Sequence, residues 1–71
     1  MKTAKNILSV DAKKIQILMA NKCMDPYGLC KKAGISYSSY QRIMRGGGCK
    51  LSTLGKLSDA LGVEVTDILE D

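Results

Sequence analysis

The sequence predicts a single all-α domain built from five short helices. Three observations support this fold class: apolar residues recur at helical spacing, capping residues and glycines separate the apolar segments, and no segment shows the strict alternation of a half-buried strand. The 71 residues suffice for one small core, and the shares of 45% hydrophobic and 25% charged residues are those of a globular chain.

The first helix is predicted from about residue 10 to residue 23. Asp11 in its first turn and Lys22 in its last turn both favour the helix dipole. Its apolar residues fall at i, i+3 and i+4 and form one stripe: Ile15, Leu18 and Met19.

Residues 1–9, MKTAKNILS, are predicted to form a basic N-terminal arm, and residues 10–71 the folded domain. The arm carries two lysines and the apolar pair Ile7 and Leu8. Its composition leaves two possibilities open, a flexible arm or a segment that packs one of these apolar residues on the first helix.

The second helix is predicted from Pro26 to about Ala33. Asp25 can accept hydrogen bonds from the first free amides, and proline is tolerated at the first helical position, where no amide donor is missed. Gly34 supplies the positive φ that ends this helix.

The third helix is predicted from Tyr37 to about Arg45, with Ser36 as its N-cap and Gly46–Gly48 as a loop beyond it. At 100° per residue one face is apolar and is predicted to enter the core: Tyr40, Ile43 and Met44. The other face is polar: Ser38, Gln41, Arg42 and Arg45. Two short helices joined by a tight turn indicate a helix-turn-helix, a motif that binds DNA.

The fourth helix is predicted to be capped by Ser52 and to end at Gly62. Its leucines repeat at helical spacing: Leu54, Leu57 and Leu61. A short fifth helix within residues 63–71 is predicted to close the core with its apolar residues: Val63, Val65, Ile68 and Leu69.

Charge is distributed unevenly along the chain. Residues 1–50 carry ten Lys/Arg and two Asp, a net +8, whereas residues 51–71 carry one Lys and five acids, a net −4. No acid lies between Asp25 and Asp59. A surface that faces phosphates would produce this pattern, and solubility alone would also account for it.

Catalytic and cofactor chemistry have little support in the sequence. Histidine is absent, the cysteines form no CxxC pair, and the glycine run does not follow a strand as a phosphate loop requires. We expect a non-enzymatic cytoplasmic protein without a cofactor, metal, small-molecule ligand or membrane span. Cys23, Cys30 and Cys49 are predicted to be reduced thiols, with Cys49 exposed after the glycines and able to oxidise.

The order of these segments resembles the Cro/phage-repressor type, or XRE-like, helix-turn-helix family over about residues 11–70. LCKKAGIS resembles the second helix and turn of that family, Ile43 with Gly46 the end of its recognition helix, and ALGVEVTDIL its closing segment. The resemblance implies a five-helix phage-repressor-like domain that binds operator DNA, usually as a homodimer, with the third helix in the major groove.

The resemblance also implies which residues contact double-stranded DNA. Tyr37, Ser38 and Arg42 are the expected base-facing residues, and Arg42 could donate bidentately to guanine. The remaining candidates would contact phosphates or flanking positions: Tyr27, Ser36, Ser39, Gln41, Arg45 and Lys50.

We therefore expect a sequence-specific DNA-binding transcriptional regulator. A repressor is expected rather than an activator, because no separate activation or ligand domain is evident. Its dimer contact would come from the apolar segment around Val65 and Ile68 or from Ile7 and Leu8. The alternative is a protein-interaction module on the same fold, antitoxin-like or regulator-binding, with little specific DNA binding.

Overall fold

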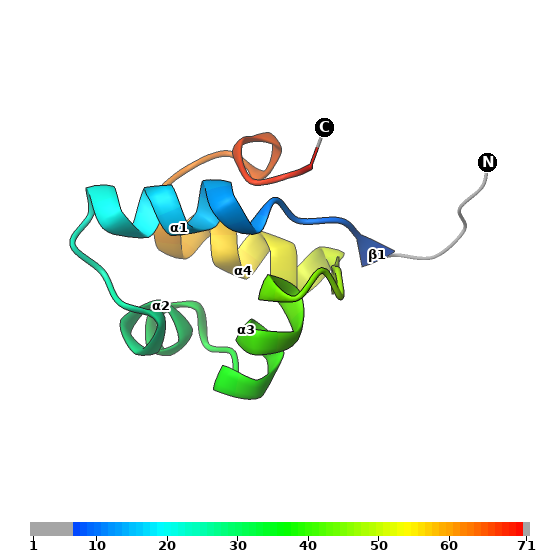
Figure 1. The fold of residues 1–71 in the computed structure, drawn as a ribbon, viewed down its shortest axis with the longest axis horizontal. Coiled ribbons are helices and arrows are strands. Elements are labelled where there is room, and N and C mark those ends of the chain that lie inside the picture. Colours follow the sequence, from blue (N-terminus) through cyan, green and yellow to red (C-terminus); the bar gives the residue numbers. More distant parts are fainter. Residues whose placement is uncertain (1–6, 71) are drawn as a thin grey trace.

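The structure, a computed structural model, describes residues 7–70 and contains four α-helices. In chain order they are α1 (Ala12–Asn21), α2 (Pro26–Ala33), α3 (Tyr37–Met44) and α4 (Leu51–Leu61). Figure 1 shows α2 and α3 on one side of the layer formed by α1 and α4, with the C-terminal segment on the other side. The all-α class is confirmed.

The predicted count of five helices is wrong, because the segment after α4 forms only one turn of 3-10 helix, η1 (Val65–Asp67). Glu64 and Asp67 close this turn reciprocally as a capping box, and the Glu64 amide donates to Asp67 Oδ2 at 3.0 Å. The backbone beyond the turn is engaged by the start of the domain: Ile68 O accepts from the Asp11 amide at 2.8 Å. The chain after η1 instead pairs with the start of the domain, where Leu69 forms a bridge with Val10, so the turn does not lengthen into a helix.

The first helix begins later than predicted. Val10 forms an isolated antiparallel bridge with Leu69, so its backbone is extended rather than helical. Asp11 is the N-cap rather than a first-turn residue, and its carboxylate accepts from the Lys14 amide at 3.2 Å. The predicted helix start moves by two residues as a result.

Both ends of α2 are confirmed. The Asp25 carboxylate accepts from the Gly28 amide at 2.7 Å, and Pro26 occupies the first turn. Gly34 ends the helix in the left-handed conformation, with φ of 75°.

The start of α3 is confirmed, and its end lies one residue before the predicted position. The Ser36 hydroxyl accepts from the Ser39 amide at 3.1 Å and donates to Ser39 Oγ at 3.0 Å. Met44 is the last helical residue, and Arg45 is the C-cap.

The start predicted for α4 is wrong. Lys50, not Ser52, is its N-cap, and no side chain caps it. The reason is that β2 (Cys49–Lys50) runs directly into the helix, paired antiparallel with β1 (Ile7–Leu8). The end at Gly62, with φ of 70°, is confirmed.

The β1–β2 pairing places Ile7 opposite Lys50 and Leu8 opposite Cys49. This pairing could not be predicted from the sequence, since each strand has only two residues and the strands lie far apart along the chain. Residues 1–6 of the predicted arm lie outside the described residues, and the division of the chain at residue 9 stays a prediction.

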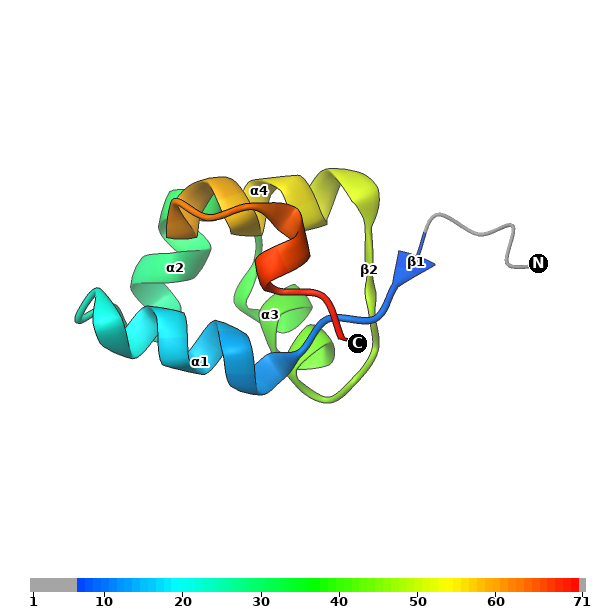
Figure 2. The same cartoon turned by 90° about the horizontal axis from the view of Figure 1, so that it is seen from above.

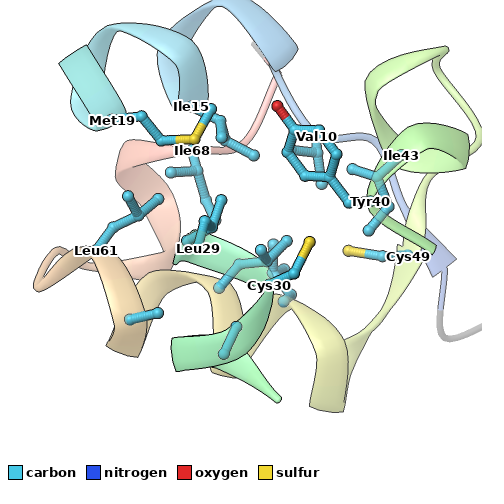
Figure 3. Packing of buried hydrophobic residues seen from close by; sticks show 14 residues of the cluster. Val10, Ile15, Met19, Leu29, Cys30, Tyr40, Ile43, Cys49, Leu61 and Ile68 are labelled. Atoms are coloured by element: carbon cyan, nitrogen blue, oxygen red, sulfur yellow. The ribbon is translucent and has the colours of Figure 1, made fainter. Parts of the chain in front are cut away.

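All four α-helices and the C-terminal segment contribute to one apolar core (Figure 3). Its largest fully buried side chains come from every helix and from the segment after η1: Ile15, Leu29, Ile43, Leu54, Leu57, Leu61 and Ile68. Seen from above, η1 lies between α1 and α4 (Figure 2), where Ile68 seals the core. Ile68 is therefore not available as the dimer contact that was expected of it.

Cys49 is buried, with 5% of its surface exposed, so the expectation of an exposed thiol there is wrong. Its position in β2 turns it into the core beside α4, and burial raises the pKa of the thiol. Cys30 is also buried and its pKa is raised for the same reason, whereas Cys23 is exposed. No helix within residues 7–70 is long and apolar enough to cross a bilayer.

Candidate nucleic-acid interface

The face of α3 that points away from the core is polar, as its periodicity predicts. Tyr40 and Ile43 are buried and attach the helix to the core, and Met44 is half-buried. The exposed residues are Ser38, Gln41, Arg42 and Arg45. Because the two faces differ so strongly, the orientation of α3 about its own axis is fixed by burial of its apolar side.

Other predicted contact residues surround this face. Tyr27 at the start of α2, Ser36 before α3 and Lys50 after the glycine loop are exposed. Ser39 and Tyr37 are half-buried. Figure 1 shows α2 and α3 together on one side of the α1–α4 layer, and Lys50 of β2 shares a surface hollow with Arg42 of α3.

The Ser36 hydroxyl is already engaged, because it donates to Ser39 Oγ and accepts from the Ser39 amide. Its proton is therefore committed within the protein. The Ser39 hydroxyl accepts the proton of Ser36, which leaves its own proton to be donated elsewhere. Of these two serines, Ser39 is the one whose hydroxyl proton is not used in the Ser36–Ser39 pair.

Three tyrosine rings form a continuous stack from the surface into the core. Tyr27 stacks on Tyr37 with ring centroids 4.7 Å apart and planes at 16°, and Tyr37 stacks on Tyr40 at 5.8 Å and 22°. Tyr27 is 66% exposed and Tyr40 only 6% exposed. The stack connects the first turn of α2 to the first turn of α3 and to the core behind them.

The tyrosine stack also changes the chemistry of its members. Tyr27 raises the pKa of Tyr37, first through a side-chain hydrogen bond and second through charge repulsion. Burial, with smaller contributions from Cys30 and Tyr37, raises the pKa of Tyr40. Both shifts act at alkaline pH, because a phenol of ordinary pKa is already neutral near pH 7.

An open hollow of about 210 Å³ lies where α3 gives way to the glycine loop. It is lined by Arg42, Gly47, Gly48, Cys49 and Lys50. The cations of α3 and β2 thus share one depression in the surface. Proximity of Arg42 and Lys50 could not be inferred from the sequence, because it depends on the path of the loop.

Three of the acids lie on the far side of the molecule from α2 and α3. Glu64, Asp67 and Glu70 belong to the C-terminal segment, on the opposite side of the α1–α4 layer from α2 and α3 (Figure 1). Asp25 is the acid at the start of α2, and its carboxylate is turned toward the Gly28 amide at 2.7 Å. An anion that approaches the start of α2 would therefore meet a carboxylate that already interacts with a helix N-terminus.

Among residues 7–70, no three His, Cys, Asp or Glu side chains are grouped so that they could hold a metal ion. The chemistry of the side formed by α2, α3 and β2 is that of hydroxyl, amide, guanidinium and ammonium donors. Such donors recognise phosphates and base edges.

The family model described as the Cro/C1-type HTH DNA-binding domain matches residues 14–71. Among solved structures, the restriction-modification controller protein C.AhdI from Aeromonas hydrophila is similar, with 23% identity and a TM-score of 0.72, over 79% of this chain and 86% of that one. A mutant of hydroxyethylphosphonate dioxygenase is similar over 90% of this chain, with 19% identity and a TM-score of 0.78. This chain spans 14% of the dioxygenase, and both likenesses concern the fold alone. No curated protein matches the sequence.

Proposed function

This chain is a DNA-binding transcription regulator of the Cro/C1-type helix-turn-helix family, and we propose that it is a repressor that inserts α3 into the major groove of a specific double-stranded site. The observation that carries the proposal is the polarity of α3. Its apolar side is sealed in the core by Tyr40 and Ile43, while its polar side is exposed beside α2. A helix held in this way can enter the groove without rearrangement of the core.

In this proposal Ser38 and Arg42 read base edges. Arg42 is exposed near the end of α3, where its guanidinium can donate two hydrogen bonds to guanine O6 and N7. Ser38 lies one turn earlier and can donate or accept. Tyr37 contributes its hydroxyl, because its ring is held between two other tyrosines.

The remaining residues position the protein on the DNA backbone. Lys50 faces a phosphate beyond the glycine loop, and Tyr27 faces one at the start of α2. Further backbone and flanking contacts come from the first and last turns of α3 and its exposed face: Ser36, Ser39, Gln41 and Arg45. These contacts add affinity for any sequence and make binding fall as salt rises.

We further propose that a homodimer binds the DNA. Two copies related by a two-fold axis would place their α3 helices roughly 34 Å apart, one turn of DNA, and would read an inverted repeat. Since Ile68 is buried, the exposed apolar residues Ile17 on α1, at 53%, and Leu51 on α4, at 54%, are better candidates for subunit contact.

Selection of bound DNA from a random pool tests the function directly. The expected result is enrichment of one sequence, with half-sites one helical turn apart, and an affinity that falls steeply between low and physiological salt. Enrichment of no sequence, together with binding that is indifferent to salt, would favour the alternative of a protein-interaction module. Repression follows if the enriched site, placed over a promoter, reduces transcription when the protein is present.

A further inference from the structure

The C-terminus of α3 is closed by two hydrogen bonds from the glycine loop. The Gly46 amide donates to Ile43 O at 3.0 Å, and the Gly47 amide donates to Arg42 O at 2.9 Å. Gly46 has φ of 91°, in the left-handed region. This is a Schellman motif. Gly47, the second residue after the C-cap Arg45, donates to the carbonyl of Arg42, the third residue before that C-cap.

In such a motif the side chains of those two residues commonly pack against each other. Here the inner residue of the pair is Arg42, the proposed base reader, and the outer residue is Gly47, which has no side chain. The space that an outer side chain would occupy is therefore taken by the stem of the arginine.

The fit at Gly47 is tight. A Cβ atom built there would lie 2.8 Å from Arg42 Cγ, 2.8 Å from Arg42 O and 3.4 Å from Arg42 C. Distances below 3.0 Å require something to move. Because Cγ is the second carbon of the side chain, moving it changes χ1 and swings the whole guanidinium. Moving Arg42 O instead would loosen the 2.9 Å bond that ends the helix.

We propose that Gly47 is a specificity-determining residue of this protein, which acts by positioning Arg42. The proposal rests on the proposed function, in which Arg42 reads a base. Gly47 touches no DNA in this role. It leaves room for the arginine stem and fixes the last turn of α3, so that the guanidinium emerges in one direction beside the hollow lined by Arg42 and Lys50.

The test compares Gly47→Ala with Gly55→Ala on the site selected by the unsubstituted protein. Gly55 is a matched control: it lies inside α4, and a Cβ there would meet nothing within 4 Å. Affinities are measured for the selected site and for every single-base variant of it. The base pair read by Arg42 is the one at which Arg42→Ala loses its preference.

Gly47→Ala should lower the preference at that base pair by at least about fivefold and leave the preferences at other base pairs unchanged. Gly55→Ala should leave all preferences unchanged. In an Arg42→Ala background, adding Gly47→Ala should have no further effect on specificity, because the two residues act through one contact. Salt dependence should be the same for Gly47→Ala, Gly55→Ala and the unsubstituted protein, and weaker in the two variants that lack the Arg42 charge.

A uniform loss of affinity across all base pairs, or a change in base preference caused by Gly47→Ala that persists without the Arg42 side chain, would overturn the inference and leave the proposed function intact. If Arg42→Ala relaxes no base pair although one DNA site is selected, the inference also fails alone. If the unsubstituted protein selects no DNA at all, both the proposed function and the inference are wrong.

A measurement on the unsubstituted protein covers the case in which Gly47→Ala does not fold. Nuclear Overhauser contacts between the Arg42 γ protons and the Gly47 α protons should be strong, and the Arg42 side chain should show one χ1 rotamer. Absence of these contacts, or averaging over several χ1 rotamers, would contradict the positioning role.

Discussion

The rings of Tyr27 and Tyr37 stack face to face across the turn of the helix-turn-helix, with centroids 4.7 Å apart and planes at 16°. One ring belongs to the first turn of α2 and the other to the first turn of α3. Tyr37 in turn stacks on the buried Tyr40. The angle between the two helices is therefore supported by aromatic contact as well as by the turn at Gly34.

Loss of the outer ring should weaken this support. Tyr27→Ala is expected to lower the free energy of unfolding by about 0.5–1.5 kcal/mol, the usual contribution of an aromatic pair. Tyr27→Phe keeps the ring and loses only the hydroxyl, so it should retain most of the stability that Tyr27→Ala loses. Urea unfolding followed by circular dichroism measures both, and equal stability of the alanine and phenylalanine variants would show that the stack does not stabilise the fold.

Stability should fall at alkaline pH. The pKa values of Tyr37, Tyr40, Cys30 and Cys49 are raised in the folded state, so the folded protein holds these protons more tightly than the unfolded chain. Their contribution is complete below the unfolded pKa values, about 8.5 for thiols and 10 for phenols, and is lost as pH rises through the folded values. Urea midpoints should be flat from pH 6 to 8 and decline above about pH 9. Midpoints that stay constant to pH 10.5 would contradict these shifts.

Arg42 and Lys50 should differ in how their loss affects DNA binding. Arg42→Ala is expected to cost about 1–3 kcal/mol on the selected site and to relax the preference at one base pair. Lys50→Ala should weaken binding to all sequences alike and reduce the salt slope by about 1. Titrations at several salt concentrations, on selected and scrambled DNA, separate the two. The same pattern for both variants would argue against their separate roles.

Substitution of Gly34 and of Gly55 by alanine separates the effect of backbone conformation from the effect of space. A Cβ at either position would meet nothing within 4 Å, yet Gly34 has φ of 75° and Gly55 lies inside α4. Gly34→Ala should destabilise the fold by about 1 kcal/mol or more, whereas Gly55→Ala should stabilise it by up to about 1 kcal/mol. Thermal unfolding shows the sign of each effect, and destabilisation by both would mean that space rather than φ is limiting.

The three thiols should react at very different rates. Cys23 is exposed, whereas Cys30 and Cys49 are buried with raised pKa values. A thiol-specific reagent at neutral pH should label Cys23 in a fast phase, and should label Cys30 and Cys49 only at the rate at which the protein unfolds locally or globally. Cys23→Ser should remove the fast phase without changing stability, while Cys49→Ser should cost about 1–3 kcal/mol by burying a hydroxyl. A fast reaction in the Cys23→Ser variant would show that a buried thiol is accessible.

Helix ends that depend on local chemistry could be predicted from the sequence. Asp25, Ser36, Gly34 and Gly62 each do what their residue type favours, and each interacts with residues only a few positions away. Ser52 is the instructive exception. A serine before a leucine repeat has the right local pattern, but the backbone before it is already committed to a strand whose partner lies far back in the sequence.

The candidate site also combines features that local sequence predicts with features that depend on distant parts of the chain. The polar face of α3 follows from 100° per residue, so the exposure of Ser38 and Arg42 was predictable. The contact of Tyr37 with Tyr27 was not, because it depends on the angle between two helices. The spacing of Tyr37 and Tyr40 at i and i+3 was a usable signal for the inner part of the tyrosine stack. Nothing in the sequence could place Gly47 against Arg42, since that needs the path of the loop.

The bridge between Val10 and Leu69 pairs the segment before α1 with the segment after η1. The Glu70 amide donates to Ser9 O at 3.1 Å, so the two outer segments of the described polypeptide already touch. Fraying of either segment would therefore break the pairing of both, so the helix pair and its exposed arginine belong to a domain whose two outer segments open together.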